Sequence, residues 1–435
     1  MPLPQLPTVW NVYNLRGSPF FQDTLIQGHD RRSLDLFVGR RSEMSDLRRY
    51  LHGRDSSRQA IAGAPGVGKT TLVQMLKGQL LEDGYLTTDS LVPFVTGDTP
   101  ESLFGRVLGA VYDTILANRP MSGDHPAMQA AQQMVRATRL STGGGGISVL
   151  GLGGNISKGV TLSSPKDLLI DGPRVLRDLM NMVRATDEAR GLLLHLNNLE
   201  NLSGRDALRA ADLLQSLRDP MLLHEGLHII VVGTVDAVNA VVNTHAQVRS
   251  VFRVPMLVQP LQHDEVHDLL RVRYEQWTLQ PLQPVSPPVH PQAVDRLLEV
   301  FQGDLRGLLK ALDDGVEGCI GLASVSSSVV GVDQAPVPPV GLAELSRALQ
   351  ARYATIMQSE LDELRVRQIY RWIDFDPSVH RTQKDLTALW DLTQGTVSAA
   401  LAQLVEHGYI VAQPRQGRQA ISYSLTGKAR LIAGL

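Results

Sequence analysis

Apolar residues recur along the chain with two spacings, one typical of buried strands and one typical of helices. Short apolar runs lie at LVPFV (91–95), GLLLHL (191–196) and LHIIVVG (227–233), and residues with helical spacing fill the intervals. A further short strand leads into Gly63, and the amphipathic helix after it ends near Gly84. Strands that alternate with helices predict an α/β fold, in which helices cover both faces of a parallel sheet.

Two stretches do not follow this alternation. Residues 1–36 mix polar and apolar positions and predict an N-terminal arm that leads into the α/β domain at 37–257. Within that domain, residues 141–165 combine many glycines with alternating apolar positions. This Gly-rich insert is typical of a flexible hairpin and equally of a disordered surface loop, and both interpretations stay open.

The pattern becomes helical after residue 257. Residues 258–322 predict a small helical domain, and residues 323–341, rich in Ser, Val and Pro with one charge, predict a linker. The C-terminal domain, 342–435, starts with a helix; its residues 381–430 fit helix, three-residue turn, helix, strand, wing and strand. The core of this predicted winged helix should hold five apolar residues, with a glycine ending the second helix: Leu386, Leu389, Val397, Leu401, Leu404 and Gly408.

Composition restricts the classes of protein to which the chain can belong. Its 435 residues suggest roughly two to four domains. The net charge of -2 means that nucleic-acid binding must come from a local patch. Cys319 is the single cysteine, which excludes an internal disulfide and fits a reducing compartment. With no signal-like start, and with Asp236 and Asn239 interrupting the apolar stretch 227–242, we expect a cytoplasmic protein without a membrane partner.

A glycine-rich phosphate loop is the strongest motif of the sequence. GAPGVGKT (63–70) fits the pattern G-x-x-x-x-G-K-[ST], between a strand and a helix. Its glycines allow backbone N–H groups to surround phosphate oxygens, Lys69 brings a positive charge, and Thr70 offers a hydroxyl to Mg²⁺. The predicted nucleotide contacts are Gly63, Pro65, Gly66, Val67, Gly68, Lys69, Thr70 and Thr71.

The strand GLLLHL should deliver the acidic pair that holds Mg²⁺ and polarises the attacking water. At this place the sequence has Asn197 and Asn198. An amide cannot act as a base, and it binds a divalent ion more weakly than a carboxylate does. Glu200 follows closely, and it is open whether this acid approaches the ion or is a charge at the start of a helix.

Several short motifs occur in the order seen in AAA+ ATPases. After the phosphate loop and the strand that ends in asparagines come VVGTVD (231–236), QVRSVF (247–252) and GDLR (303–306), and FVGRRSE (37–43) precedes them. With a terminal winged helix, the chain resembles the origin-recognition and replication-initiator branch of that family, with the STAND ATPases as near relatives. The resemblance implies a P-loop AAA+ module, a helical lid domain and a C-terminal winged helix.

The resemblance also implies roles for individual residues. Asp236 takes the place of the sensor-1 residue, with Thr234 as an alternative. Arg249 would be the arginine finger that reaches a neighbouring subunit, with Arg253 as a competitor, and Arg306 matches sensor 2. The residues beside the adenine would be Val38, Gly39 and Arg40.

The departures from the family pattern, at Asn197, Asn198 and Asp236, concern catalysis, whereas the binding elements are intact. We therefore expect ATP and Mg²⁺ as cofactors, with slow or absent ATP hydrolysis. A site that keeps ATP can act as a switch, because a ligand favours the conformation that it binds more tightly.

The C-terminal segment also resembles MarR-like winged-helix domains. Its second helix would present Gln394, Thr396 and Ser398 to the major groove of duplex DNA. Arg415 and Arg418 in the wing are placed for phosphate contacts. Because winged helices also dock proteins, that alternative stays open.

Three functions are compatible with these features. The first is an ATP-controlled, DNA-binding protein of the initiator type, which forms homo-oligomers through its AAA+ modules and recruits a partner in replication or transposition. The second is a signalling or defence switch of the STAND kind. The third is a transcription or transposition regulator that senses ATP.

Overall fold

The computed structural model describes residues 8–22, 38–88, 90–142, 168–185, 189–199, 202, 205–327, 337–413 and 420–434. They divide into two compact units. The P-loop unit contains Arg40–Gln259, and the helical unit contains residues 8–22, 38–39 and 260–434. Most of the Gly-rich insert, Glu200 and the wing residues Arg415 and Arg418 lie outside the described residues.

The P-loop unit is built on a parallel sheet with the strand order β2-β4-β5-β1-β6, in which β3 also pairs with β4. This confirms the predicted fold class. The last residue of β1, Ala62, pairs with Gly233 at the end of β5, so that the two strands end together. The strands are β1 (Ser57–Ala62), β2 (Tyr85–Leu86), β3 (Val92–Pro93), β4 (Gly191–Asn197), β5 (Leu227–Gly233) and β6 (Met256–Leu257).

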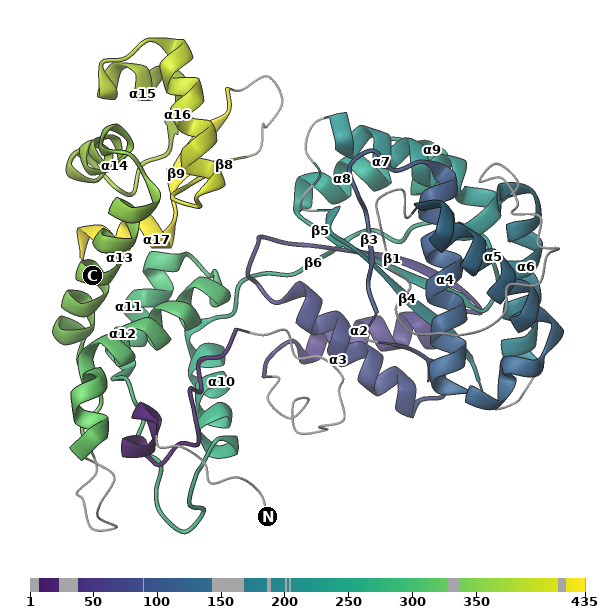
Figure 1. The fold of residues 1–435 in the computed structure, drawn as a ribbon, viewed down its shortest axis with the longest axis horizontal. Coiled ribbons are helices and arrows are strands. Elements are labelled where there is room, and N and C mark those ends of the chain that lie inside the picture. The colour runs from purple at the N-terminus through teal and green to yellow at the C-terminus, as the bar shows by residue number, and fades with distance from the viewer. Residues whose placement is uncertain are drawn as a thin grey trace. The chain divides into compact units, whose positions relative to one another are not determined.

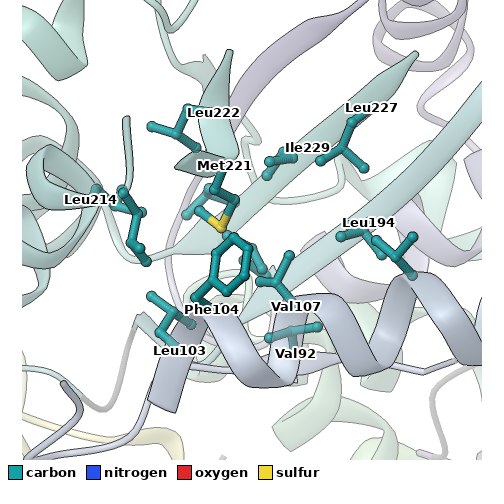
Figure 2. Packing of buried hydrophobic residues seen from close by; sticks show 14 of the residues in the cluster. Val92, Leu103, Phe104, Val107, Leu194, Leu214, Met221, Leu222, Leu227 and Ile229 are labelled. Carbon is teal, nitrogen blue, oxygen red and sulfur yellow. The ribbon is translucent and has the colours of Figure 1, made fainter. Parts of the chain in front are cut away.

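Helices cover both faces of this sheet (Figure 1). One face packs into a large apolar core, which includes Phe104 and Val107 of α4, Leu194 of β4 and Ile229 of β5 (Figure 2). The elements that contribute to this core are α4 (Pro100–Asn118), α5 (Pro126–Thr142), α6 (Leu168–Arg184), α7 (Arg205–Ser216), the π-helix η5 (Arg218–Leu222), α8 (Val235–Asn243) and α9 (Ala246–Arg249).

The opposite face of the sheet is covered by α3 (Lys69–Glu82), with α2 (Arg41–His52) beside it. This face is richer in polar residues than the first. Strand register places Gln59, His195 and His228 on it, all of them buried.

The helical unit has a second core. The 3-10 helix η1 (Val9–Tyr13) contributes Trp10 and Tyr13 to this core and contacts α12. α12 runs to Ser327 and so extends past residue 323, where the linker was expected. The helices of this part are α10 (His263–Gln276), α11 (Pro291–Phe301), α12 (Leu305–Ser327) and α13 (Leu342–Glu360).

The C-terminal part of the helical unit is a winged helix. Its antiparallel sheet has the order β7-β9-β8. The residues between α15 and α16 form the predicted three-residue turn, and Gly408 lies after α16 with φ 71°. Leu386, Val397, Leu401 and Leu404 are buried as predicted, and Leu389 is half-buried. The elements are α14 (Glu363–Phe375), β7 (Arg381–Thr382), α15 (Gln383–Trp390), α16 (Gln394–Glu406), β8 (Ile410–Gln413), β9 (Ser422–Leu425), α17 (Gly427–Arg430) and the 3-10 helix η6 (Leu431–Ala433).

Within the described ranges, no helix is long and apolar enough to cross a bilayer.

Candidate nucleotide-binding site and winged helix

The phosphate loop joins β1 to the first residue of α3. Gly66 and Gly68 adopt φ 79° and 89°, a region that other residues rarely occupy. Gly63 is required for a different reason, because a Cβ atom at this position would lie 2.6 Å from the carbonyl oxygen of Val258. The three glycines therefore permit a backbone path that other residues would obstruct, and the path ends at a helix N-terminus suited to anions.

Lys69 is held inside this loop. Its side chain is buried, and Nζ donates hydrogen bonds to the carbonyl oxygens of Gly63, at 3.2 Å, and Ala64, at 2.8 Å. The backbone of the loop thus holds the positive charge of Lys69 at the loop. The other predicted loop contacts range from exposed to buried: Pro65 is exposed, Thr70 and Thr71 are half-buried in the first turn of α3, and Val67 is buried.

Arg40 braces the phosphate loop from the start of α2. Its guanidinium donates to the carbonyl oxygens of Val67, at 3.2 Å, and Gln259, and it forms an ion pair with Glu43 at 3.1 Å. The residue is buried and has φ 59°. The sequence carries no signal for this brace, because two of the three partners are backbone carbonyl groups far along the chain.

Val38 and Gly39 lie in the helical unit, where Val38 is packed against the apolar core. Gly39 has φ 78°, and a Cβ atom there would lie 3.0 Å from Glu265 Oε1 of α10. Gly39 therefore lies against the start of α10 within this unit.

Asn197 ends β4 with its side chain buried and on the α3 side of the sheet. The backbone oxygen accepts a hydrogen bond from Phe94 N at 2.9 Å, whereas Oδ1 has no hydrogen-bond partner among the described residues. An unsatisfied buried oxygen costs free energy, so this atom is suited to accept from a bound group.

The chain turns sharply after β4. Asn198 adopts φ 70°, a conformation that asparagine tolerates better than most residues. Leu199 then lies over the end of β5, where a Cβ atom on Gly233 would be only 2.7 Å from Leu199 Cβ. Glu200 lies outside the described residues, so its approach to the site stays a prediction.

The oxygen donors near the phosphate loop fit Mg²⁺ only in part. The Thr70 hydroxyl and Asn197 Oδ1 are neutral, whereas Mg²⁺ in proteins is held by carboxylates and substrate phosphates. In the part of the chain that is described, no group of three or more His, Cys, Asp or Glu side chains could hold a metal ion. The phosphate oxygens of a nucleotide are charged ligands that would complete such a site.

The proposed sensor-1 position follows β5 directly. Asp236 is an exposed residue in the first turn of α8, and partial desolvation raises the pKa of its carboxyl group. The alternative residue, Thr234, is the N-cap of the same helix, and its hydroxyl accepts from Ala237 N at 3.3 Å. Of the two side chains, Asp236 is therefore the more available for a contact with a bound group.

The two candidate finger arginines have different surroundings. Arg249 is exposed at the end of α9, and none of the described side chains forms an ion pair with it. Arg253 forms an ion pair with Asp46 at 2.9 Å and lies 4.8 Å from the centre of the Tyr50 ring. Arg306, in the helical unit, is exposed in the first turn of α12.

The winged helix offers an exposed helix start. Gln394 and Ser398 of α16 are exposed, while the Thr396 hydroxyl lies 2.9 Å from the Thr393 hydroxyl within the helix cap. Lys428 forms an ion pair with Glu360.

Residues 371–419 match the MarR family. No curated protein sequence matches the chain. Solved structures to which the chain is similar include that of Aeropyrum pernix ORC2 in ADPNP-ADP complexes, which is 15% identical, covers 93% of this chain and 96% of that one, and has a TM-score of 0.47. The structure of A. pernix ORC1 in complex with DNA is 14% identical, covers 95% of both chains and has a TM-score of 0.43. That of Cdc6p from Pyrobaculum aerophilum is also 14% identical, covers 95% of both chains and has a TM-score of 0.42.

The phosphate loop thus follows β1 of a parallel sheet with the strand order β2-β4-β5-β1-β6, and the region that matches the MarR family lies within the winged helix.

Proposed function

We propose that the protein is an ATP-binding switch of the replication-initiator type, which binds duplex DNA and hydrolyses ATP slowly or not at all. One observation carries the proposal: the phosphate loop has the glycine conformations that suit phosphate, while the strand that we expect to end in acidic residues ends in Asn197, whose Oδ1 is neutral. The residues expected to bind the phosphates are thus present, whereas an amide stands where hydrolysis would need a carboxylate.

Nucleotide binding is supported by the loop and by the helix behind it. Gly66 and Gly68 hold the conformation that turns backbone N–H groups inward, and Lys69 is already positioned by two loop carbonyls. Mg²⁺ bound to the phosphates would neutralise their charge, with Thr70 and Asn197 as neutral oxygen contacts. Arg40 holds the loop in place by donating a hydrogen bond to the carbonyl oxygen of Val67.

Slow hydrolysis follows from the two amides. Asn197 and Asn198 cannot accept a proton from the attacking water, and loss of a general base typically lowers the rate by about 10² to 10⁴. If Glu200 does not replace them, ATP stays bound long enough to stabilise one conformation of the protein.

DNA binding is assigned to the winged helix. The exposed start of α16 presents Gln394 and Ser398, which are suited to base edges, and Thr396 lies between them at the helix cap. Arg415 and Arg418 are the proposed phosphate contacts of the wing. The helix start carries no positive charge, so affinity would depend strongly on the wing and on salt.

Assembly is assigned to the AAA+ module. Arg249 is exposed and without an ionic partner in the described chain, whereas Arg253 is held by Asp46 and Tyr50. An arginine that must reach a neighbouring subunit's phosphate has to be available, which favours Arg249. We expect homo-oligomers whose formation depends on ATP, and a protein partner in replication or transposition.

The first test measures ATP binding and ATP hydrolysis side by side. Equilibrium binding of labelled ATP with Mg²⁺ and steady-state turnover are measured for the wild-type chain, Lys69→Ala and the double variant Asn197→Asp, Asn198→Glu. Asn181→Asp, on an exposed face of α6, controls for added negative charge. The wild type should bind ATP in a Lys69-dependent manner and turn over well below about 1 per second.

The double variant should raise turnover by about 10²-fold or more, and the control should not. Robust, Lys69-dependent turnover of the wild-type chain would contradict the proposal. The DNA assignment is tested separately, by duplex binding at several salt concentrations for Arg415→Ala, Arg418→Ala. The matched control is Arg271→Ala, Arg296→Ala, which removes two exposed arginines from the helical unit.

A further inference from the structure

A hollow of about 480 Å³ lies in the P-loop unit away from the phosphate loop. It is formed by the last turns of α2 and the segment after α9. Arg253 N donates to the carbonyl oxygen of Arg58, near the start of β1, whereas the phosphate loop follows the end of this strand at Ala62. Four residues of strand separate the two positions by about 13 Å.

The hollow is lined by three arginines and a single acid. Arg253 is the one that is paired, with Asp46 at 2.9 and 3.3 Å. Arg49 and Arg54 are exposed and have no carboxylate partner in the described ranges. Three guanidinium groups and one carboxylate leave the lining with a net charge of +2. We name this site, made of Asp46, Arg49, Tyr50, Arg54 and Arg253, the arginine hollow.

Tyr50 orders two of these cations. The guanidinium carbon of Arg54 lies 4.9 Å from the centre of the Tyr50 ring, and that of Arg253 lies 4.8 Å from it. Guanidinium groups held against an aromatic ring keep their N–H edges available for hydrogen bonds. The like charges are therefore brought together in a partly enclosed space, where an anion would relieve their mutual repulsion.

We propose that the arginine hollow binds a phosphate-bearing small molecule, at a site separate from the phosphate loop. Planar guanidinium forks suit phosphate oxygens in two-pronged contacts. The volume exceeds the need of one phosphate group and falls within the range of pockets that hold small molecules, about 300 to 1,000 Å³. A concave site between a helix and a loop favours a compact polyphosphate or phosphate ester over an extended duplex.

The test uses the full chain with Lys69→Ala, so that the phosphate loop contributes little, and inorganic pyrophosphate as the probe. Isothermal titration calorimetry compares this background with the same chain carrying Arg49→Ala, Arg54→Ala. The matched control carries Arg174→Ala, Arg209→Ala, which removes two exposed arginines from the same unit. Circular dichroism melting confirms that each chain is folded.

Pyrophosphate should bind the Lys69→Ala chain saturably, and the Arg49, Arg54 double variant should lose about tenfold or more in affinity. The Arg174, Arg209 control should differ by less than twofold. Equal affinity in both double variants, or no saturable binding in the Lys69→Ala chain, would overturn the proposal.

A second arm titrates a short duplex DNA at the same ionic strength. If Arg49→Ala, Arg54→Ala weakens duplex binding while pyrophosphate fails to bind, the hollow serves backbone phosphates and the small-molecule proposal is wrong. Replacement by lysine, Arg49→Lys and Arg54→Lys, keeps the charge but removes the forks. If the arginines make two-pronged contacts, the lysine variant should recover less than half of the binding free energy that the alanine variant loses. Full recovery would contradict two-pronged contacts.

Discussion

Acid should destabilise the P-loop unit through His228 in β5. This side chain is fully buried, with Nδ1 2.8 Å from the Ser57 hydroxyl and the ring edge-on to Tyr85 at 5.3 Å. Burial, followed by the charges of Arg58 and His52, lowers the pKa of His228 from 6.5 to about 3. The folded unit therefore holds this imidazole neutral over the whole range from neutral pH to about pH 4.

The direction of the effect follows from proton binding. Below pH 6.5 the unfolded chain protonates this histidine, whereas the folded chain does not until about pH 3. The unfolded state thus binds more protons, and stability falls as pH falls, by about 1.4 kcal/mol per pH unit. Between pH 7.5 and pH 5 the contribution of His228 amounts to about 2 kcal/mol.

The assay is urea unfolding at pH 7.5, 6.5 and 5 for the wild type and His228→Phe, followed by far-UV circular dichroism. Tryptophan fluorescence reports the helical unit separately, because all four tryptophans lie there: Trp10, Trp277, Trp372 and Trp390. The variant keeps a ring beside Tyr85 but cannot titrate, so its loss of stability between pH 7.5 and pH 5 should be smaller by about 2 kcal/mol. An equal loss in both chains would refute the reasoning, whatever the absolute stability of the variant.

Three further predictions concern other residues. Gly68→Ala should cost about 1 to 2 kcal/mol in unfolding free energy and abolish ATP binding, since alanine is strained at φ 89°; unchanged ATP affinity by equilibrium binding would contradict this. His195→Leu should leave stability equal or raise it by about 1 to 3 kcal/mol in urea unfolding, because both ring nitrogens are buried without hydrogen-bond partners among the described residues; a large loss would count against it. Arg249→Ala should prevent ATP-dependent oligomers in sedimentation without lowering the melting temperature, whereas Arg253→Ala should lower it; the reverse pattern would assign the finger to Arg253.

The sheet could be predicted where hydrophobic runs are long. β4 and β5 are seven-residue strands buried throughout, and their apolar runs are visible in the sequence. β2 and β6 have two residues each and are held by pairing with β4 and β1, so they leave no periodic pattern. β1, with the sequence SRQAIA, is half polar although entirely buried, because Arg58 and Gln59 donate to backbone carbonyl oxygens and the Ser57 hydroxyl pairs with His228 Nδ1.

The site was predictable where its chemistry depends on local backbone conformation. The glycines of the phosphate loop are required because a Cβ atom would strain or obstruct the backbone there, so a short sequence motif is enough to identify them. Arg40 and Arg253 could not be assigned, because their contacts come from residues such as Gln259 and Asp46, distant in sequence. Arg249 and Arg253 look equivalent in the sequence, and only their surroundings distinguish an available charge from an engaged one.

The contact between Leu199 and Gly233 has a mechanical consequence. Because a Cβ atom at position 233 would lie only 2.7 Å from Leu199 Cβ, the turn after β4 can lie over the end of β5, just before α8, only with glycine at this position. We expect a group that displaces Asn197 and Leu199 to press on the segment that begins at Thr234. That segment leads through α8 and α9 to Arg249. We therefore expect a group bound beside Asn197 to act, through Leu199, on the segment that carries Arg249.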